Sequence, residues 1–394
     1  MNWRRNLTAL WFAEFTAIFG FSFAFPFLSI FLSKDLGVHA GRDLDLWTAA
    51  SASASGFALA VASPIWGILG DRFGRKPMLL RSMVGGALFV GLIFFVQNPT
   101  ELIVLRFLQG ATSGTVAAAT ALVAAETPRL RVGWALGVVT SAIALGGAIG
   151  PVVGGLAGDL FGLRLVFLGG GVALFLAIIP VVLIVRESPL VRMSGPRLST
   201  LAVISQKPGL DRALAVLIGS QGLISTVNAA TQQLVVLRLL ELLSTGVSAV
   251  SGFGFGLSGL ASSAAAIGYT RVTARLGYVR TAAVAAGLVA VAVAALGIAP
   301  WAAMVVIAMA LNGLFSGVVL PATASMIGLE TPPEAQSTVF GLNASSVALG
   351  FAFGPIIGGT VAAASGVQAS LFVVAGLGVL LAVLIARGAR EPAR

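Results

Sequence analysis

The chain has 394 residues, of which 58% are hydrophobic and only 10% charged, and its mean hydropathy is +1.01. Soluble globular proteins carry about 25% charged residues, so this composition excludes a soluble protein and indicates an integral membrane protein. The net charge of +10 would suggest nucleic-acid binding in a soluble chain, but in a membrane protein basic residues first report topology. The sequence has no cysteine, which excludes disulfides and thiolate metal sites, and its single histidine, His39, lies in a predicted loop.

Twelve apolar segments are long enough to cross a bilayer as helices, which takes roughly 20 residues each. The predicted spans are residues 6–32, 46–69, 78–97, 101–125, 134–158, 164–185, 213–237, 247–268, 281–298, 301–328, 338–362 and 368–386. The first segment is too long for the core of a signal peptide and lacks a small-residue cleavage pattern, so we expect it to remain as the first helix. The fold class is therefore an all-α membrane protein.

The basic residues are distributed unevenly between the two sides of the predicted membrane. Arg4 and Arg5 precede the first span, and 19 of the 24 Lys and Arg residues fall on the same side as these two. Because loops rich in Lys and Arg stay in the cytoplasm, this asymmetry predicts that both termini are cytoplasmic. We expect a multi-pass protein of the plasma (inner) membrane, and the charge then reflects orientation rather than affinity for nucleic acid.

The two halves of the sequence repeat each other. Residues 147–155 read GAIGPVVGG and residues 351–359 read FAFGPIIGG, a separation of 204 residues, and the upstream ETP at 126–128 recurs at 330–332. Such parallel repeats describe a transporter with two lobes and a site between them. The prediction is an N-terminal six-helix lobe at 1–185, a cytoplasmic linker at 186–212 and a C-terminal six-helix lobe at 213–394.

The loop between spans 2 and 3 reads GILGDRFGRKP at residues 67–77. It resembles the loop signature of the major facilitator superfamily, and the resemblance extends over the whole chain. The resemblance implies the twelve-helix fold and a conformational latch, in which the family's aspartate contacts the neighbouring lobe near a helix N-terminus. The latch residues would be Gly67, Gly70, Asp71, Arg72, Gly74, Arg75 and Lys76. The second half has Ala274 in place of Asp71, and the alternative is that the basic residues only anchor the topology.

Two charged residues are candidates for proton coupling. Glu14 is the only carboxylate well inside a predicted span, about 12 Å from the inner face. Arg106 lies in span 4, within a segment that resembles an arginine motif of the same family, and its repeat position is Met309. A membrane-embedded arginine is usually turned to a cavity or a partner. The alternatives are a Glu14 solvated from the cytoplasm and an Arg106 that extends to the outer surface.

Span 5 contains glycines at every fourth position, which lie on one helix face and allow close packing. The segment resembles the antiporter motif of the family, which is found in exporters, and generic packing is the alternative. The residues assigned to this motif and its copy are Gly146, Gly150, Pro151, Gly154, Gly155, Gly354 and Pro355. Span 8, rich in glycine, is the expected packing partner of span 5.

The lobes of this family meet around helices 1, 4, 7 and 10, so polar and aromatic residues of these spans are candidates for a substrate cavity. They are Phe21, Ser22, Phe25, Gln109, Ser113, Gln221, Ser225, Asn228, Gln232, Asn312 and Ser316. A cavity with aromatic rings, neutral polar groups and few charges favours amphipathic or cationic molecules. Arg106 could hold one carboxylate, so organic anions remain an alternative.

The sequence thus predicts a proton-coupled exporter of small organic molecules that works by alternating access, as a monomer in the lipid bilayer. A transporter of a defined metabolite, such as a sugar or an amino acid derivative, is the alternative, and sodium could replace the proton. A membrane receptor or scaffold is a remote third possibility. No nucleophile, metal-ligand cluster or cofactor motif is recognisable, so we expect no enzyme activity, no cofactor and no metal.

Overall fold

The computed structural model describes residues 3–128, 131–187, 212–331 and 336–391. Within these ranges the secondary structure is helical, and twelve helical segments are long and apolar enough to cross a membrane. The prediction of an all-α membrane protein with twelve spans is confirmed. Most of the predicted linker, residues 188–211, lies outside the described residues.

The chain divides into two compact units that are not simply its two halves. Unit 1 comprises Met1–Val38, Ala54–Pro196 and Gly246–Gly256, and unit 2 comprises His39–Ser53, Arg197–Thr245 and Leu257–Arg394. Two helices contribute to both units, namely α3 (Arg42–Phe73) and α11 (Val247–Leu276). The first turns of α3 belong to unit 2, whereas the first turns of α11 belong to unit 1.

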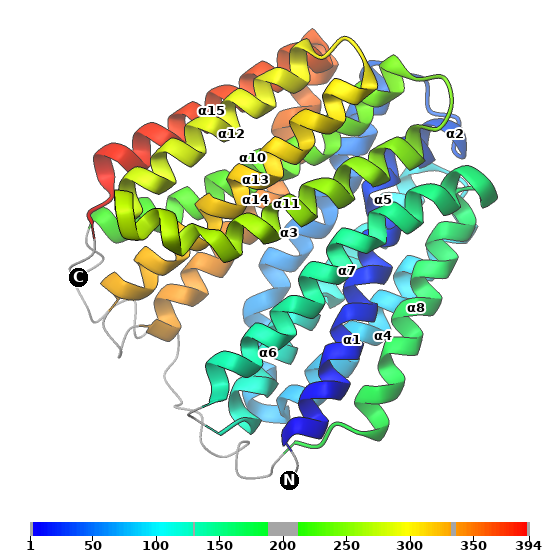
Figure 1. Cartoon of the computed structure of the whole chain (residues 1–394). Helices are drawn as coiled ribbons and strands as arrows, with labels where there is room; N and C mark the ends of the chain where they lie inside the picture. Colours follow the sequence, from blue (N-terminus) through cyan, green and yellow to red (C-terminus); the bar gives the residue numbers. More distant parts are fainter. Residues whose placement is uncertain (1–2, 129–130, 188–211, 332–335, 392–394) are drawn as a thin grey trace. The chain divides into compact units, whose positions relative to one another are not determined.

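In unit 1, α1 packs against both α7 and α8, and α4 packs against α8 (Figure 1). The helices of this unit are α1 (Trp3–Ala24), η1 (Phe25–Phe27), α2 (Leu28–Lys34), α4 (Arg75–Leu92), η2 (Ile93–Phe95), α5 (Pro99–Thr112), α6 (Thr115–Glu126), α7 (Val132–Phe161) and α8 (Leu163–Leu183). Small residues permit these approaches. A Cβ atom at Gly20 would stand 2.9 Å from the carbonyl oxygen of Gly170, so the backbones of α1 and α8 are nearly in contact.

The fourth span, predicted as one segment at 101–125, is interrupted at Ser113 and Gly114, where Gly114 has a φ of 130°. Glycine adopts this conformation without the steric cost of a side chain. The interruption frees backbone carbonyls, which must be satisfied within a membrane protein. Trp66 Nε1 donates to the Ala111 carbonyl (2.6 Å) and Arg81 Nη2 donates to the Ser113 carbonyl (3.3 Å). These side chains therefore support a break in the middle of a span.

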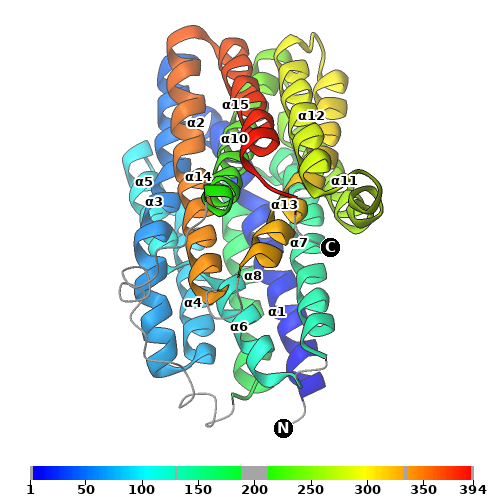
Figure 2. The ribbon, with the colours of Figure 1, turned by 90° about the vertical axis from the view of Figure 1, so that its left-hand side faces the viewer.

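In unit 2, α10 packs against α13, α14 and α15, and α12 packs against α13 and α15 (Figure 2). The bounds are α10 (Arg212–Leu242), α12 (Tyr278–Ile298), α13 (Ala302–Glu330), α14 (Gln336–Ser365) and α15 (Val367–Gly388). The α10 helix is the most enclosed span, with 72% of its most apolar window buried inside the protein. It therefore forms the centre of this unit.

One carboxylate caps a helix in the same way in each unit. Glu187 accepts from the backbone N–H groups of Arg75 (2.8 Å) and Lys76 (3.1 Å) at the start of α4. Glu391 accepts from those of Tyr278 (2.6 Å) and Val279 (2.9 Å) at the start of α12. The first turn of a helix has unpaired N–H groups and a partial positive charge, so a carboxylate stabilises it.

Candidate functional site

A hydrogen-bonded chain of polar side chains surrounds Arg106 in unit 1. The Arg106 side chain is buried, and it donates to Gln109 Oε1 (2.7 Å) and to Ser55 Oγ (2.7 Å). Gln109 in turn donates to Ser113 Oγ (2.9 Å), at the interruption of the fourth span. The guanidinium lies 4.0 Å above the centre of the Phe25 ring, a cation–π geometry. Four of the residues predicted from the sequence, Arg106, Gln109, Ser113 and Phe25, are thus brought together.

Glu14 has a different environment. Its side chain is 0% exposed, and neither carboxylate oxygen has a hydrogen-bond partner within the described part of the chain. Phe25, which contacts Arg106, follows Glu14 by eleven residues, or about 16 Å of helix. The structure therefore does not pair Glu14 with Arg106, and a buried carboxyl group without partners is costly when charged.

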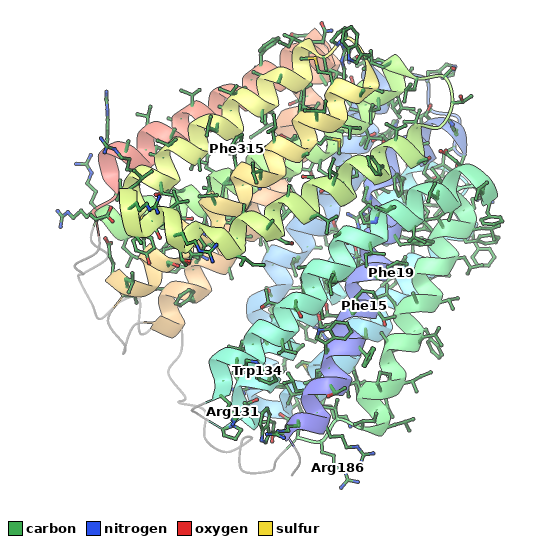
Figure 3. The ribbon with its side chains drawn as sticks, viewed as in Figure 1. Phe15, Phe19, Arg131, Trp134, Arg186 and Phe315 are labelled. Carbon is green, nitrogen blue, oxygen red and sulfur yellow. The ribbon has the colours of Figure 1, made fainter. Side chains whose placement is uncertain are left out.

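The glycines of the antiporter segment form the contact between α7 and α1. Gly146 lies against the backbone of Phe15 and Phe19, and Gly154 lies against the backbone of Phe23. Phe15 and Phe19 stand on successive turns of α1 where it runs beside α7 (Figure 3). A methyl group at any of these glycines would fall on main-chain atoms of α1, so the spacing of four residues is required for this approach.

Two further glycines of the predicted motif have partners of their own. Gly150 lies against Ser22 and the backbone of Phe19, so the predicted cavity residue Ser22 is part of the contact between α1 and α7. Gly155 points away from α1 and lies against Ser248 and Gly252 at the start of α11. Pro151 stands inside α7 and is buried, and its carbonyl oxygen is adjacent to Gly252.

The same contact recurs in unit 2, between α14 and α10. Gly350 lies against Gly222 and Thr226, and Gly354 lies against Thr226 and Ala230, while Pro355 is buried inside α14. In unit 1, Gly146 contacts Phe15 and Gly150 contacts Phe19, where their copies in unit 2 contact Gly222 and Thr226. In both cases the residue of α10 lies 207 positions after the residue of α1. By this correspondence Gln221 occupies the place of Glu14, a relation that no sequence repeat reveals.

The predicted cavity residues of unit 2 form short hydrogen-bonded pairs. Gln221 Nε2 donates to the Leu320 carbonyl (3.0 Å), and Ser225 Oγ donates to the Gln221 carbonyl (2.8 Å). Ser316 Oγ donates to Asn228 Oδ1 (3.0 Å). Asn312 Oδ1 is buried without a partner in the described part of the chain, and Gln232 is exposed. In unit 1, Phe21 stacks on Phe25 with 6.0 Å between ring centres.

The loop signature lies at the junction of α3 and α4. Gly74, with a φ of 100°, turns the chain between the two helices, and a Cβ at Gly70 would stand 3.3 Å from Met78, whereas Gly67 has open space around it. The Arg75 and Lys76 side chains donate to backbone carbonyls of α6, α8 and the residues after α8. The side chains of Asp71 and Arg72 lie outside the described residues, so the latch stays a prediction.

Two charged residues of interest were not singled out by the sequence. The Arg81 guanidinium lies 3.7 Å above the Trp66 ring and reaches the interruption at Ser113. The predicted second span begins at residue 46 and so leaves Asp45 outside it. The helix begins at Arg42, and Asp45 is 5% exposed in its first turn. Glu14 is therefore not the only buried carboxylate. The acidic residues that precede the apolar run were the sequence signal that this helix begins earlier than residue 46.

The comparisons with known proteins agree with this architecture. Residues 10–240 and 222–394 match the sequence model of the Major Facilitator Superfamily. The chain is 31% identical over 373 residues to the multidrug resistance protein MdtG of Proteus mirabilis, covering 94% of this chain and 92% of that one. It is 29% identical over 395 residues to MdtG of Klebsiella pneumoniae, covering 100% and 95%.

Solved structures show the same fold at lower sequence identity. The human organic anion transporter MFSD10 has a TM-score of 0.69 at 21% identity, covering 98% of this chain and 100% of that one. The nucleoside transporter NupG has a TM-score of 0.79 at 14% identity, covering 96% and 98%. With two matches that together cover nearly all of the sequence, the chain belongs to the major facilitator superfamily, as a multi-pass membrane transporter rather than an enzyme.

Proposed function

We propose that the protein is a proton-coupled exporter of small amphipathic or cationic organic molecules. The names of its relatives in Proteus and Klebsiella, multidrug resistance protein, support export of such compounds. The antiporter segment, with its glycines packed on α1, supports the same assignment. We further propose that it works as a monomer in the plasma (inner) membrane with both termini in the cytoplasm, in keeping with the placement of Lys and Arg.

The observation that carries this proposal is the isolation of Glu14. A fully buried carboxyl group with no hydrogen-bond partner among the described residues is stable only if it binds a proton, a cation or water. Such a group can take a proton from one side of the membrane and release it to the other as the transporter changes state. Glu14 is therefore the proposed proton carrier.

The comparison with Gln221 suggests what the proton does. The amide of Gln221 donates to the Leu320 carbonyl of α13, and the counterpart of this part of α13 in unit 1 is α6, since α6 ends at the ETP segment of residues 126–128 and α13 ends at its copy. The α1 and α6 helices are in contact. A protonated Glu14 has an O–H group that can donate where a glutamine donates an N–H, whereas a charged Glu14 can only accept. Protonation would thus let α1 bind α6 as α10 binds α13.

The polar chain of unit 1 is the proposed binding surface for the exported molecule. Phe21 and Phe25 offer aromatic faces, and Gln109 and Ser113 offer neutral hydrogen-bonding groups. Arg106 is held by Gln109, Ser55 and the Phe25 ring, so its charge is partly satisfied before any ligand binds. This arrangement favours an aromatic, weakly polar molecule over a phosphate or a sugar.

The test is transport by the purified full-length chain in liposomes under an imposed pH gradient. Wild-type protein should move a lipophilic cation against its concentration gradient, and Glu14→Gln should lose this uphill transport while still exchanging the compound downhill. Asp43→Asn, which changes an exposed carboxylate, is the matched control and should behave as wild type. Uphill transport that persists in Glu14→Gln, or wild-type flux that ignores the pH gradient, would contradict the proposal.

A further inference from the structure

Asp45 is a buried carboxylate in the first turn of α3, a part of that helix that belongs to unit 2. It is 5% exposed, whereas Asp43 in the same turn is exposed. Both residues gain from the partial positive charge of the helix N-terminus. Only Asp45 has been withdrawn from solvent, so its position needs a reason beyond helix capping.

Close packing does not supply that reason. The backbone of Asp45 lies against Gly359 of α14, just as the backbone of Ser248 lies against Gly155 of α7. The two contacts are copies, since Asp45 and Ser248 are 203 residues apart and the two glycines 204. The atoms of Asp45 and Ser248 that lie closest to these glycines belong to the main chain. The contact does not require a carboxylate, since unit 1 makes it with a serine. The carboxylate is therefore an addition to the packing motif.

The surroundings of Asp45 contain unsatisfied polar groups. Gln233 of α10 is 7% exposed, and neither its Oε1 nor its Nε2 atom has a partner in the described part of the chain. A Cβ atom at Gly359 would stand 3.0 Å from Gln233 Nε2 and 2.8 Å from the main-chain carbonyl oxygen of Asp45. The Gln233 amide therefore lies beside the first turn of α3. Thr48, one turn after Asp45, is 2% exposed with its hydroxyl likewise unpaired. Buried polar groups of this kind normally have a partner.

No described basic group is paired with Asp45. The charged group of α10 that acts on it is the carboxylate of Glu241, a like charge that is itself paired with Arg238. Arg238, on the same helix, is already engaged, since it donates to Glu241 Oε2 (2.7 Å) and to the Ala299 carbonyl (2.9 Å). The α14 helix has no charged residue in its sequence, and Asp45 forms no ion pair with another described residue. On its own helix, Arg42 and Asp43 are both exposed and offset each other.

We propose that Asp45 is a second proton-binding carboxyl group of the transport cycle, located in unit 2, and that on protonation it becomes the partner that the Gln233 amide and the Thr48 hydroxyl lack in this structure. This inference rests on the proposed proton-coupled export and adds one proton to it. A buried amide can accept from a protonated carboxyl group and donate to it at the same time. The cycle would then exchange two protons, one on Glu14 and one on Asp45, for each molecule exported.

Charge stoichiometry tests this proposal. Exchange of two protons for one monovalent cation moves one net charge and responds to membrane potential, whereas exchange of one proton is electroneutral. With tetraphenylphosphonium as the probe and potassium with valinomycin setting the potential, wild-type liposomes should transport faster under a favourable potential at equal pH on both sides. Asp45→Asn should lose that response and retain transport driven by a pH gradient. Asp43→Asn is the matched control and should respond to the potential as wild type does.

Two results would overturn the inference while leaving the proposed function intact. One is a wild-type exchange that is driven by pH but indifferent to potential, and the other is an Asp45→Asn variant that responds to potential as wild type does. Loss of all pH-driven transport in wild type would instead refute the proposed function. If Asp45→Asn does not fold, Gln233→Leu gives the second measurement. The Gln233→Leu variant should shift the pH at which potential-driven transport is half-maximal, and an unshifted value would also overturn the inference.

Discussion

Gly155 of α7 lies so close to the carbonyl oxygen of Ser248, at the start of α11, that no side chain could be placed between them. The first turns of α11 are part of unit 1 through contacts of this kind, although most of that helix belongs to unit 2. The copy of the contact, between Gly359 and Asp45, places the first turns of α3 in unit 2. At both glycine contacts of the repeated motif, the first turns of a helix thus pack in one unit while most of that helix belongs to the other.

Replacing Gly155 by alanine should destabilise the protein. The new methyl group would meet backbone atoms of Ser248 and Gly252, which cannot move aside as a flexible side chain can. Overpacking of this kind costs about 1–3 kcal/mol, and it should lower the midpoint of thermal unfolding in detergent. Gly147→Ala is the control, because its nearest neighbour is a side-chain atom of Ile18 at 3.9 Å. Equal midpoints for the two variants would contradict this account of the motif.

Replacing Trp66 by phenylalanine should weaken the interruption of the fourth span. The change removes the Nε1 donor to the Ala111 carbonyl and keeps an aromatic ring beneath Arg81. An unpaired carbonyl costs about 1–3 kcal/mol when fully buried, and this one is partly buried, so the free energy of unfolding should fall by about 1 kcal/mol. Trp301→Phe, at an exposed position, is the control. A Trp66→Phe variant as stable as wild type would show that water satisfies this carbonyl.

Replacing Arg106 by lysine should impair binding more than the retained charge suggests. The guanidinium donates to Gln109 and Ser55 with two different nitrogens while lying over Phe25, and an ammonium group cannot reproduce this fork. Loss of one such hydrogen bond to a charged group corresponds to about 1.5–3 kcal/mol, or roughly tenfold or more in affinity. Substrate binding to purified protein measures the effect, and wild-type affinity in Arg106→Lys would exclude a role for the fork.

The environment of Asp35, just beyond the end of α2, predicts that the stability of the folded protein depends on pH. Burial raises the pKa of its carboxyl group above the ordinary value of 3.8, although Arg164, at 3.7 Å, and Lys34 act in the opposite direction. The folded protein thus holds this proton more tightly than the unfolded chain, so the contribution of Asp35 to stability declines as the pH rises through its folded pKa. Asp35→Asn should remove this decline, making the variant more stable than wild type at pH 7 but not below pH ~4. Because the group is partly solvated, the gain should be under about 1 kcal/mol, and unfolding midpoints at the two pH values measure it.

The number of spans, the duplication and the family were all predictable from the sequence. Hydropathy along the chain is a local property, and a segment of about 20 apolar residues has few alternatives to a membrane helix. The repeated Gly-Pro segments and the loop signature at 67–77 are likewise visible as letters. Some of the residues around Arg106 could be predicted from the sequence, because spans 1 and 4 have few polar side chains.

The interruption at Gly114 was not predictable in the same way. The residues around it, QGATSGT at 109–115, are small and partly polar, but glycine and small residues are common inside membrane helices, so the pattern alone does not mark a break. Its stability depends on Trp66 and Arg81, which are distant in the sequence. The correspondence of Glu14 with Gln221 was hidden for a similar reason, since it follows from which turns of α1 and α10 the two glycine motifs contact.

The sequence by itself determined that this chain is a twelve-span transporter with two related halves, because length, hydropathy and charge asymmetry act along the chain. Only the tertiary structure decided which charged groups are isolated and which are paired. Arg106 acquires its partners, Glu14 and Asp45 lose contact with solvent, and Gly155 meets Ser248 through packing between helices far apart in the sequence. In a membrane protein both faces of a helix are apolar, so the pattern of residues does not reveal which face meets a neighbour.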